Sequence, residues 1–387
     1  MFEYPSDHVD DSVIAEEDVG KKISLEKRLS YFIRSFRPTS AREEYDSTSP
    51  FPALYYEECL FEGHPYILPM IVLRTNPCNW YTKTGGCLTC GYQGIAKFKG
   101  ISDADILAQV DAALRHLRLK GELPFLHLTS SGSFFDQREI SDAVMIAIAQ
   151  RMETEGVRVF STESRADVVT NHDRLALFRK YYSGAISVGI GLESMDEDIR
   201  NLCFFKGVKN RTLERAISTL KDFNMNFHAY VLVGKPFLTP EEDVEDAFTA
   251  LSYAIEKGGK VLLMVANIQQ DTPLYALWKK GLYTLPSLWA PIKVLRKLEP
   301  GLRFRVAVKG LDKAVPPPHM FQQTCNLCTP VVRNALVGFN WTKDFLMIDQ
   351  AWNCCSCREV WEKTLEIHDE RPIRQRIESV LKQFKHS

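Results

Sequence analysis

Three cysteines lie close together in the stretch RTNPCNWYTKTGGCLTCGYQG, which covers residues 74–94. Cys78, Cys87 and Cys90 have no fourth cysteine near them in the chain. A [4Fe–4S] cluster usually takes four cysteines, so three would leave one iron open. The open iron can be chelated by the amino and carboxylate groups of S-adenosylmethionine, whose reductive cleavage yields methionine and a 5′-deoxyadenosyl radical. The alternatives are a three-thiolate zinc site with a distant fourth ligand, or buried thiols used as small apolar groups.

A second cysteine group is formed by CNLC and CCSC near the end of the sequence. Cys325 with Cys328 and Cys354 with Cys357 make two CxxC pairs, the spacing that lets two tight turns give four thiolates to one tetrahedral zinc. Cys355 makes the pattern ambiguous, because it could replace Cys354 as the ligand. A second iron–sulfur cluster also fits four cysteines. We favour structural zinc, because the intervening VVRNALVGFNWTKDFLMIDQAW is typical of a small helix–strand module that a metal would staple.

The elements that must position these cysteines are indicated by a repeated alternation of strand-like and helix-like segments. Apolar runs of strand length cover residues 65–74, 123–131, 156–164, 185–194, 226–234 and 260–269. Segments with helical periodicity cover residues 102–120, 138–155, 171–183, 211–224 and 239–258. Near-continuous apolar strands separated by helices indicate a parallel sheet that is buried on both faces. Six such units are too few for a full eight-unit barrel, so the pattern predicts an α/β fold with a partial (β/α)6 barrel.

Polar residues follow each of the predicted strands, where a barrel of this kind carries its functional groups. The cysteine triplet follows the first strand, and SSGSFFD, STESRAD, GIGLES, GKPF and NIQQDTP follow the others. This position favours an iron–sulfur site over the alternatives for the triplet. We expect an N-terminal extension over residues 1–60, the barrel over 61–300, and a cysteine-rich module with a terminal helix over 301–387.

Composition limits the class of protein. The 387 residues include 48 Lys plus Arg, 49 Asp plus Glu and ten cysteines. The near-zero net charge provides no general attraction to nucleic acid or membrane, so a polyanion would need a local basic patch. No apolar run approaches the ~18 residues of a membrane span, and the acidic N-terminus is unlike a secretory signal. We expect a soluble, cytoplasmic protein in which clustered cysteines indicate metal, and in which the isolated Cys59 and Cys203 are packing residues.

The cysteine stretch resembles the cluster loop of the radical S-adenosylmethionine subunit of archaeosine synthase, a family related to the elongator catalytic subunit. The likeness continues through SSGSFFD, ESR, GIGLES, KPFLTPEE, NIQ…TP and GLYTLPSLW to CNLC and CCSC, and covers about residues 65–365. SSGSFFD and GLYTLPSLW are more specific than a bare CxxC. The common loop of radical enzymes is CxxxCxxC, whereas this family has a longer first gap, and here eight residues separate Cys78 from Cys87. The resemblance implies a radical S-adenosylmethionine barrel.

The resemblance also implies roles for individual residues. The three loop cysteines would ligate the cluster, and six residues after the strands would contact S-adenosylmethionine: Ser131, Gly132, Ser133, Glu163, Arg165 and Glu193. Arg165 suits the cofactor's carboxylate, because arginine pairs carboxylates bidentately, and Glu163 suits its ribose hydroxyls. A salt bridge between these two residues is the alternative. The usual aromatic residue before the last cysteine is Thr89 here, which leaves Tyr92 as the nearest substitute. Weaker candidates for cofactor or substrate contact follow the sixth strand: Asn267, Gln269 and Gln270.

The activity that the resemblance implies is scission of a C–N bond in transfer RNA that carries a deazaguanine joined to lysine, which would leave archaeosine. It further implies an electron donor such as ferredoxin or flavodoxin, and a partner subunit. One local feature supports RNA, a basic stretch that could contact phosphates: Lys293, Arg296, Lys297, Arg303, Arg305, Lys309 and Lys313. A charge run is nevertheless usually a solvated face, and part of this one, RFRVAVKG, has the pattern of an amphipathic strand.

Two other functions stay open. The chain could be a radical enzyme of the same architecture that acts on a small molecule or a peptide, which the neutral charge and the acidic N-terminal extension favour slightly. It could also be a non-catalytic, metal-stapled scaffold that binds RNA. An acetyltransferase like the elongator subunit is disfavoured, because the chain after the barrel is short and holds the second cysteine group.

Overall fold

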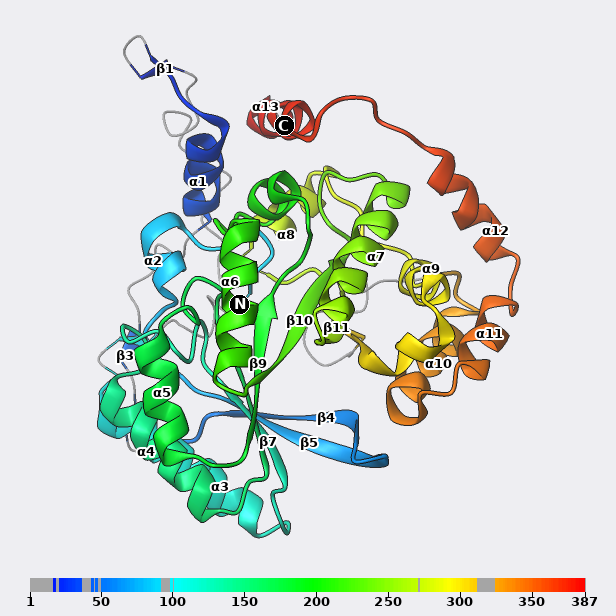
Figure 1. The fold of residues 1–387 in the computed structure, drawn as a ribbon. Helices are drawn as coiled ribbons and strands as arrows, with labels where there is room; N and C mark the ends of the chain where they lie inside the picture. Colours follow the sequence, from blue (N-terminus) through cyan, green and yellow to red (C-terminus); the bar gives the residue numbers. More distant parts are fainter. Residues whose placement is uncertain are drawn as a thin grey trace.

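A central sheet of eight strands organises the protein (Figure 1). The computed structural model describes residues 17–18, 21–36, 43–44, 46–47, 50–91, 98–99, 101–270, 272–311 and 324–386. The strands are β4 (Ala53–Phe61), β5 (His64–Val72), β7 (Phe125–Thr129), β8 (Val159–Glu163), β9 (Ala185–Gly191), β10 (Asn226–Val233), β11 (Lys260–Val265) and β12 (Val306–Lys309). Their order is β12-β11-β10-β9-β8-β7-β5-β4, and every pair is parallel except β4 with β5. Two-residue strands form two further small sheets: β1 (Glu17–Asp18) with β2 (Lys21–Lys22), and β3 (Glu43–Glu44) with β6 (Phe98–Lys99).

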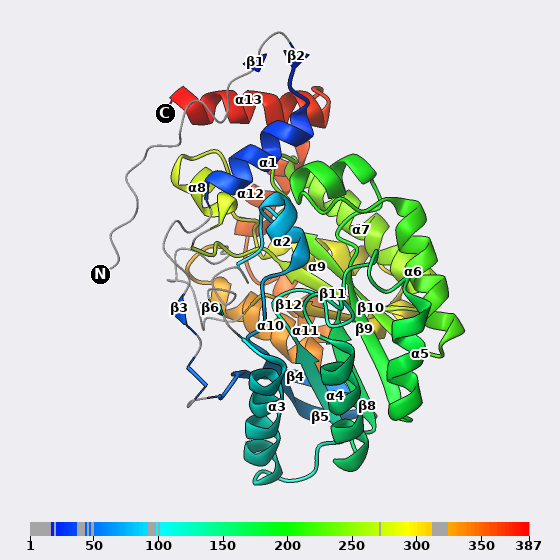
Figure 2. The same cartoon turned by 90° about the vertical axis from the view of Figure 1, so that its left-hand side faces the viewer.

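Helices surround the sheet in Figures 1 and 2. Those between the strands are α3 (Asp103–Arg118), α4 (Asp142–Thr154), α5 (His172–Tyr181), α6 (Asn210–Asp222), α7 (Pro240–Glu256), α8 (Pro273–Lys279) and α9 (Trp289–Lys297). Capping boxes start α3 at Ser102 and α7 at Thr239. In each, the cap hydroxyl accepts a hydrogen bond from the backbone N–H three residues later, and the acidic side chain of that later residue accepts one from the backbone N–H of the cap residue. The six strands and five helices predicted from the sequence are confirmed.

Two strands of the sheet were not among the six predicted. Strand β4 lies in the predicted N-terminal extension and forms a hairpin with β5 through Glu62 and Gly63, both of which have positive φ. Strand β12 lies beyond residue 300 and pairs in parallel with β11, so the amphipathic pattern of RFRVAVKG is a real strand. Both of the predicted flanking segments therefore contribute a strand to the sheet.

The two outer strands of the sheet approach one another. Lys309 on β12 donates from Nζ to the backbone oxygen of Glu58 on β4 at 3.1 Å, and it forms an ion pair with Glu57 at 2.7 Å. Helix α10 (Thr329–Thr342) packs against β4, β5 and β12. The sheet is thus a nearly closed barrel, in which side chains and a helix fill the seam between β12 and β4.

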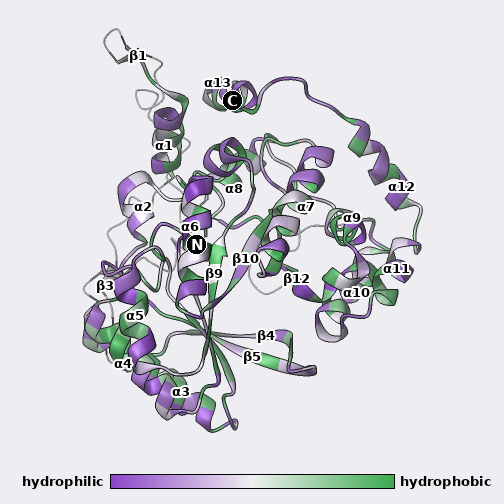
Figure 3. Ribbon diagram, in the orientation of Figure 1, coloured by the Kyte–Doolittle hydropathy of each residue, from purple (hydrophilic) through white to green (hydrophobic). Residues whose placement is uncertain are grey.

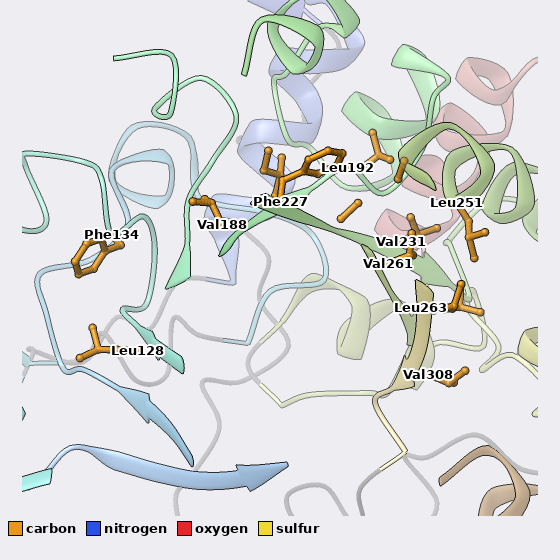
Figure 4. Packing of buried hydrophobic residues seen from close by; sticks show 14 of the residues in the cluster. Leu128, Phe134, Val188, Leu192, Phe227, Val231, Leu251, Val261, Leu263 and Val308 are labelled. Atoms are coloured by element: carbon orange, nitrogen blue, oxygen red, sulfur yellow. The ribbon is translucent and has the colours of Figure 1, made fainter. Parts of the chain in front are cut away.

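Side chains on the outer face of the barrel form the main core with the helices. Figure 4 shows Leu128, Val188, Val231, Leu263 and Val308 on five of the strands, and all five are fully buried. Strands such as β9 are accordingly coloured as hydrophobic in Figure 3, whereas the surrounding helices carry both hydrophobic and hydrophilic residues. The positions between these core residues point into the barrel, since successive side chains alternate across a strand. Several of the inward positions are polar: His127, Ser161, Glu163, Ser187, His228 and Tyr230.

The N-terminal and C-terminal helices meet over the loops at one end of the barrel (Figure 2). Helix α1 (Leu25–Ser35) contacts α13 (Ile373–His386) through the rings of Phe32 and Phe384, whose centroids lie 5.1 Å apart. Both helices share a second apolar core with Leu88, which follows a loop cysteine. None of the described helices is long and apolar enough to cross a membrane.

Candidate functional site

A cavity of about 320 Å³ lies at the C-terminal ends of the barrel strands. It brings together most of the residues that the sequence singled out: Cys78, Cys87, Cys90, Ser131, Gly132, Glu163, Arg165 and Glu193. Ser133 is fully buried and is not among the residues that line it. Tyr92 lies outside the described residues.

The long gap between Cys78 and Cys87 folds into the short helix α2 (Asn79–Thr84). Gly85 and Gly86 end this helix with positive φ and turn the chain back toward Cys87. A Cβ on Gly85 would lie 3.0 Å from the Ile33 side chain, so α1 approaches the loop closely at this point. Burial raises the pKa of the Cys78 thiol to about 11, and the carboxylate of Glu139 adds to this effect. A positively charged metal centre would offset that cost and favour the thiolate.

Glu139 connects the cysteine loop to the loop after β7. Its carboxylate accepts hydrogen bonds from the backbone N–H of Asn79 at 3.1 Å and of Ser133 at 2.7 Å. A Cβ on Gly132 would lie only 2.1 Å from a carboxylate oxygen of Glu139, so a side chain there would displace this carboxylate. Burial raises the pKa of Glu139 to about 7. This residue was not predicted from the sequence, because it lies just outside SSGSFFD and its contacts come from loop packing.

The loops after β7 and β8 are tied together behind the cavity wall. The hydroxyl of Ser133 accepts from the backbone N–H of Arg165 at 3.1 Å, and the hydroxyl of Ser164 accepts from the backbone N–H of Phe135 at 3.0 Å. Ser131, which lines the cavity, has its hydroxyl 3.4 Å from that of Thr75. The three-residue SGS segment thus has two faces, one toward the cavity and one toward the neighbouring loop.

Arg165 does not form the salt bridge with Glu163 that the sequence left open. Its guanidinium donates to Asp167 at 3.0 Å and to the backbone oxygen of Lys206 at 2.9 Å. It also lies over the ring of Trp80, 4.6 Å from the ring centroid, in a cation–π arrangement. Trp80 comes from α2, so the residues that lengthen the cysteine loop supply an aromatic wall to the cavity.

Glu163 accepts hydrogen bonds from inside the barrel. Its Oε1 accepts from the hydroxyl of Tyr230 at 2.6 Å and lies 3.5 Å from Nε2 of His127. Burial raises the pKa of Glu163, but the interactions with His127 and Tyr230 outweigh burial and hold this pKa below its ordinary value. Burial also lowers the pKa of the neighbouring His228 to about 3, so this imidazole is neutral. The ionised carboxylate of Glu163 therefore lies close to the neutral imidazole of His228.

Glu193 forms an ion pair across the cavity wall with Lys206, which was not predicted from the sequence. Its Oε1 lies 2.8 Å from Nζ of Lys206, and its backbone has a φ of 60°. Burial lowers the pKa of Lys206, but Glu193 outweighs this effect and raises it above the ordinary value. A Cβ on Gly191 would lie 2.2 Å from Nζ of Lys206, so this glycine makes room for the lysine.

The weaker candidates after the sixth strand divide into two groups. Asn267 and Gln269 line the cavity, and Gln269 packs against Gly91, where a Cβ would meet its amide oxygen at 1.6 Å. Gln270 is exposed and is not among the lining residues.

The second cysteine group comes together around four thiols. Cys325 lies 3.2 Å from Cys328 and 3.6 Å from Cys355, and Cys328 lies 3.2 Å from Cys357, measured between Sγ atoms. All four sulfur atoms lie within 4.8 Å of one another. Cys354, the predicted partner of Cys357, is exposed and outside this group, and Cys355 takes its place. The choice depends on which of two adjacent side chains faces inward, which spacing alone does not determine.

Within the described part of the chain, each cation of the basic stretch contacts an acidic side chain, an aromatic ring or a backbone oxygen. Lys293 pairs with Glu362 at 3.3 Å, Arg296 with Asp349, and Lys297 with Glu245. Lys309 pairs with Glu57, Arg303 stacks on Phe345, and Arg305 donates to the backbone oxygen of Gly258. Lys313 lies outside the described residues. Of the two isolated cysteines, Cys203 is fully buried, as expected of a packing residue, and Cys59 is half-buried on β4.

The fold and the site thus define an α/β-barrel protein with a cysteine-lined cavity and a separate four-cysteine group. No protein-family model matches the chain. It is 26% identical over 311 residues to an uncharacterized protein of Methanocaldococcus jannaschii, covering 78% of this chain and 83% of that protein. It is 28% identical over 304 residues to archaeosine synthase subunit beta of Methanosarcina acetivorans (77% and 85% covered). It is 26% identical over 311 residues to the protein of that name in Thermococcus kodakarensis (79% and 93%).

The chain is therefore a homologue of proteins named archaeosine synthase subunit beta, and the resemblance based on the sequence motifs is confirmed. Among solved structures, it is similar to an Elp3 of Methanocaldococcus infernus with 17% identity and a TM-score of 0.44, covering 60% of this chain and 57% of that one. At this level the likeness does not establish a shared fold.

Proposed function

We propose that this chain is a radical S-adenosylmethionine enzyme. The observation that carries the proposal is that Cys78, Cys87 and Cys90 line one cavity at the C-terminal end of the barrel. Among the described residues, the C-terminal cysteines are close enough together to bind a single metal ion, whereas the three loop cysteines are not. Three thiols of this kind fit a [4Fe–4S] cluster with one open iron. With S-adenosylmethionine bound, the cluster supplies a 5′-deoxyadenosyl radical.

The residues of the cavity fit the cofactor in charge and shape. Arg165 and Lys206 are cations on the wall and pair with the cofactor's carboxylate. Glu163, held ionised by its hydrogen bonds, accepts from the ribose hydroxyls. Trp80 provides an aromatic surface that the predicted loop position, Thr89, does not. Ser131 and Gly132 present a hydroxyl and backbone groups to the amino end.

The substrate that we propose is transfer RNA with a lysine-linked deazaguanine, and the reaction is cleavage of the C–N bond that leaves archaeosine. The support is the motif resemblance together with the names of the relatives. Because those relatives are named as a subunit, we propose that this chain works with a partner subunit, and that a ferredoxin or flavodoxin supplies electrons in the cytoplasm. Because cations of the basic stretch are held in ion pairs, we propose that the partner subunit supplies the RNA-binding surface.

The same ion pairs favour a second candidate, a radical enzyme of this architecture that acts on a small molecule or peptide. Binding of transfer RNA separates the two candidates. Affinity that falls steeply with salt supports the RNA substrate, because phosphate contacts release counterions. Absence of such binding, in the presence of the partner subunit, supports the second candidate.

We also propose that the four-cysteine group binds zinc. Zinc–thiolate bonds of about 2.3 Å in a tetrahedron place sulfur atoms about 3.8 Å apart. The separations of 3.2 Å and 3.6 Å between neighbouring sulfur atoms, with all four within 4.8 Å, are close to that value. A [4Fe–4S] cluster puts each thiolate on a different iron and holds the sulfur atoms farther apart.

The experiment that tests the proposal is anaerobic reconstitution with iron and sulfide, followed by metal analysis and by addition of dithionite and S-adenosylmethionine. We expect about four irons per chain at the loop and formation of 5′-deoxyadenosine. Cys87→Ala should lose both, whereas Cys59→Ala, which removes a thiol outside the cavity, should lose neither. Zinc alone without cofactor cleavage would overturn the radical function. Transfer RNA bearing the lysine adduct is then the substrate to test.

A further inference from the structure

The four-cysteine group lies at the start of helix α10, which covers the seam of the barrel. Cys328 directly precedes α10, and Cys325 lies one turn earlier, where its backbone oxygen accepts from the hydroxyl of Thr329 at 2.9 Å. Cys355 and Cys357 lie at the start of α12 (Cys357–Glu362), after α11 (Leu346–Trp352). The thiol group therefore joins two chain segments that α10 and α11 separate.

The seam is the gap between two strands that have one neighbour each. Strand β12 pairs with β11 only, and β4 pairs with β5 only, within the part of the chain that the structure describes. The outer edge of such a strand presents backbone N–H and C=O groups that need partners. In a barrel that closes fully, these two edges would pair with each other.

Side chains of α10 take the place of a neighbouring strand at the edge of β12. The Asn340 amide accepts from the backbone N–H of Val308 at 2.8 Å and donates to the backbone oxygen of the same residue at 2.6 Å. Asn340 is 5% exposed, so water does not compete well for these bonds. Lys343, just after the helix, donates from Nζ to the backbone oxygen of Val306 at 2.9 Å.

The same helix also packs against the other side of the seam. Val332, Leu336 and Phe339 on α10 are fully buried in the main core, and the helix contacts β4 and β5. Helices α11 and α12 have seven and six residues, too few to be stable without packing. A metal bound at the four thiols would cross-link the start of α10 to the start of α12.

We propose that a zinc ion held by Cys325, Cys328, Cys355 and Cys357 fastens α10 over the seam, so that closure of the barrel depends on the metal. This inference rests on the zinc site proposed above and adds its role. The seam is also connected to the cavity, because Gly310 after β12 packs on the backbone of Val265, where a Cβ would lie 2.5 Å from the oxygen. Val265 lines the cavity, so loss of the metal is transmitted to its wall.

The test compares two adjacent cysteines in the full-length protein. Cys355→Ser removes a proposed ligand, and Cys354→Ser makes the same chemical change at the exposed neighbour. We measure zinc by elemental analysis, and hydrogen exchange by mass spectrometry for the peptides that contain Val308 and Val231. We expect Cys355→Ser to lose about one zinc per chain and to exchange roughly tenfold faster at Val308, with Val231 on β10 unchanged. Cys354→Ser should match the wild type in both measurements.

A second reporter and a second variant keep the inference testable if Cys355→Ser fails to fold. Burial raises the pKa of the Cys59 thiol on β4 to about 11, which makes it slow to alkylate. Removing zinc from the wild type with a chelator should speed alkylation of Cys59 by iodoacetamide. Asn340→Ala should retain zinc and still exchange faster at Val308, because it removes the edge contact and leaves the thiols in place.

Any other result of these experiments contradicts either the set of zinc ligands or the role of the zinc at the seam. If both cysteine variants lose zinc equally, or if neither loses zinc, the proposed set of ligands is rejected. Zinc loss with unchanged exchange at Val308 and unchanged alkylation of Cys59 rejects the role at the seam and leaves the zinc site standing. Equal acceleration at Val308 and Val231 shows general unfolding and also rejects that role. The radical function is tested separately by 5′-deoxyadenosine, so its failure is distinct from all of these outcomes.

Discussion

The hydroxyl of Tyr230 donates to the carboxylate of Glu163 at 2.6 Å across an intervening strand. Glu163 ends β8 and Tyr230 lies on β10, and on β9 between them Gly189 is the register partner of Glu163 and Gly191 that of Tyr230. A Cβ at Gly189 would lie 2.8 Å from the Tyr230 ring and 3.2 Å from Cγ of Glu163. The two polar side chains meet because the strand between them has no side chain at this level.

Gly189→Ala should therefore separate the pair. The new methyl group would also lie 2.6 Å from Nε2 of His228. Overpacking of this kind costs about 1–3 kcal/mol, and we expect that loss in urea unfolding together with weaker S-adenosylmethionine binding. Gly301→Ala is the matched control, because nothing lies within 4 Å of a Cβ there. Equal stability of the two variants would contradict the close packing at β9.

The order of strands and helices was predictable from the sequence, but the lining of the barrel was not. Hydrophobic runs locate the strands because their outward residues are apolar, as Val261 and Leu263 are on β11. The inward residue His127 lies inside such a run, and nothing in the sequence shows that its neighbour across the sheet is Ser161. Polar pairs of this kind depend on the register between strands.

The site likewise contains residues that could be predicted from the sequence and residues that could not. The three cysteines lie in the loop after β5 and Glu163 ends β8, so the general rule for barrels located them. Lys206 lines the cavity from a loop and Trp80 from a short helix, whereas Glu139 is buried and hydrogen-bonded to two of the loops that line it. These positions depend on packing between segments far apart in the chain.

Acid should destabilise the barrel through His228. Burial lowers its pKa to about 3 from an ordinary value near 6.5, so the unfolded chain binds a proton that the folded chain does not. Stability from this residue is therefore full above pH 6.5 and is lost progressively as the pH falls toward 3. His228→Gln should flatten the dependence of unfolding free energy on pH in that window. His64→Gln, at the exposed β4–β5 turn, should leave it unchanged, and an equal effect of both would refute the assignment.

The two cysteine groups should respond independently to mutation. Cys87→Ala should lose iron and keep zinc, because its thiol lines the cavity far from α10 in the chain. Cys328→Ala should lose zinc, lower the melting temperature and keep the iron of the loop. Elemental analysis of both variants after anaerobic reconstitution is the measurement. Equal loss of iron from the two variants would contradict this division.

The basic stretch should contribute little to RNA binding. Arg296 and Lys297 are paired with Asp349 and Glu245, so their charges are already compensated. We expect the double variant Arg296→Ala with Lys297→Ala to leave the affinity for transfer RNA and its salt dependence nearly unchanged. Two lost phosphate contacts would instead reduce the slope of log affinity against log salt by about two. Filter binding at several salt concentrations, with the partner subunit present, distinguishes these results.

Helix α1 should matter for the cysteine loop as well as for overall stability. The hydroxyl of Ser30 donates to the backbone oxygen of Thr84 at 2.9 Å, and Ile33 packs on Gly85. Phe32 is fully buried between these contacts and Phe384 of α13, so Phe32→Ala should cost about 3–5 kcal/mol. Because α1 then leaves the loop less ordered, reconstituted protein should also lose its iron to a chelator faster. Leu119→Ala, at a residue that is 88% exposed, is the control. Unchanged iron loss in a clearly destabilised Phe32→Ala would show that α1 stabilises the fold without bracing the loop.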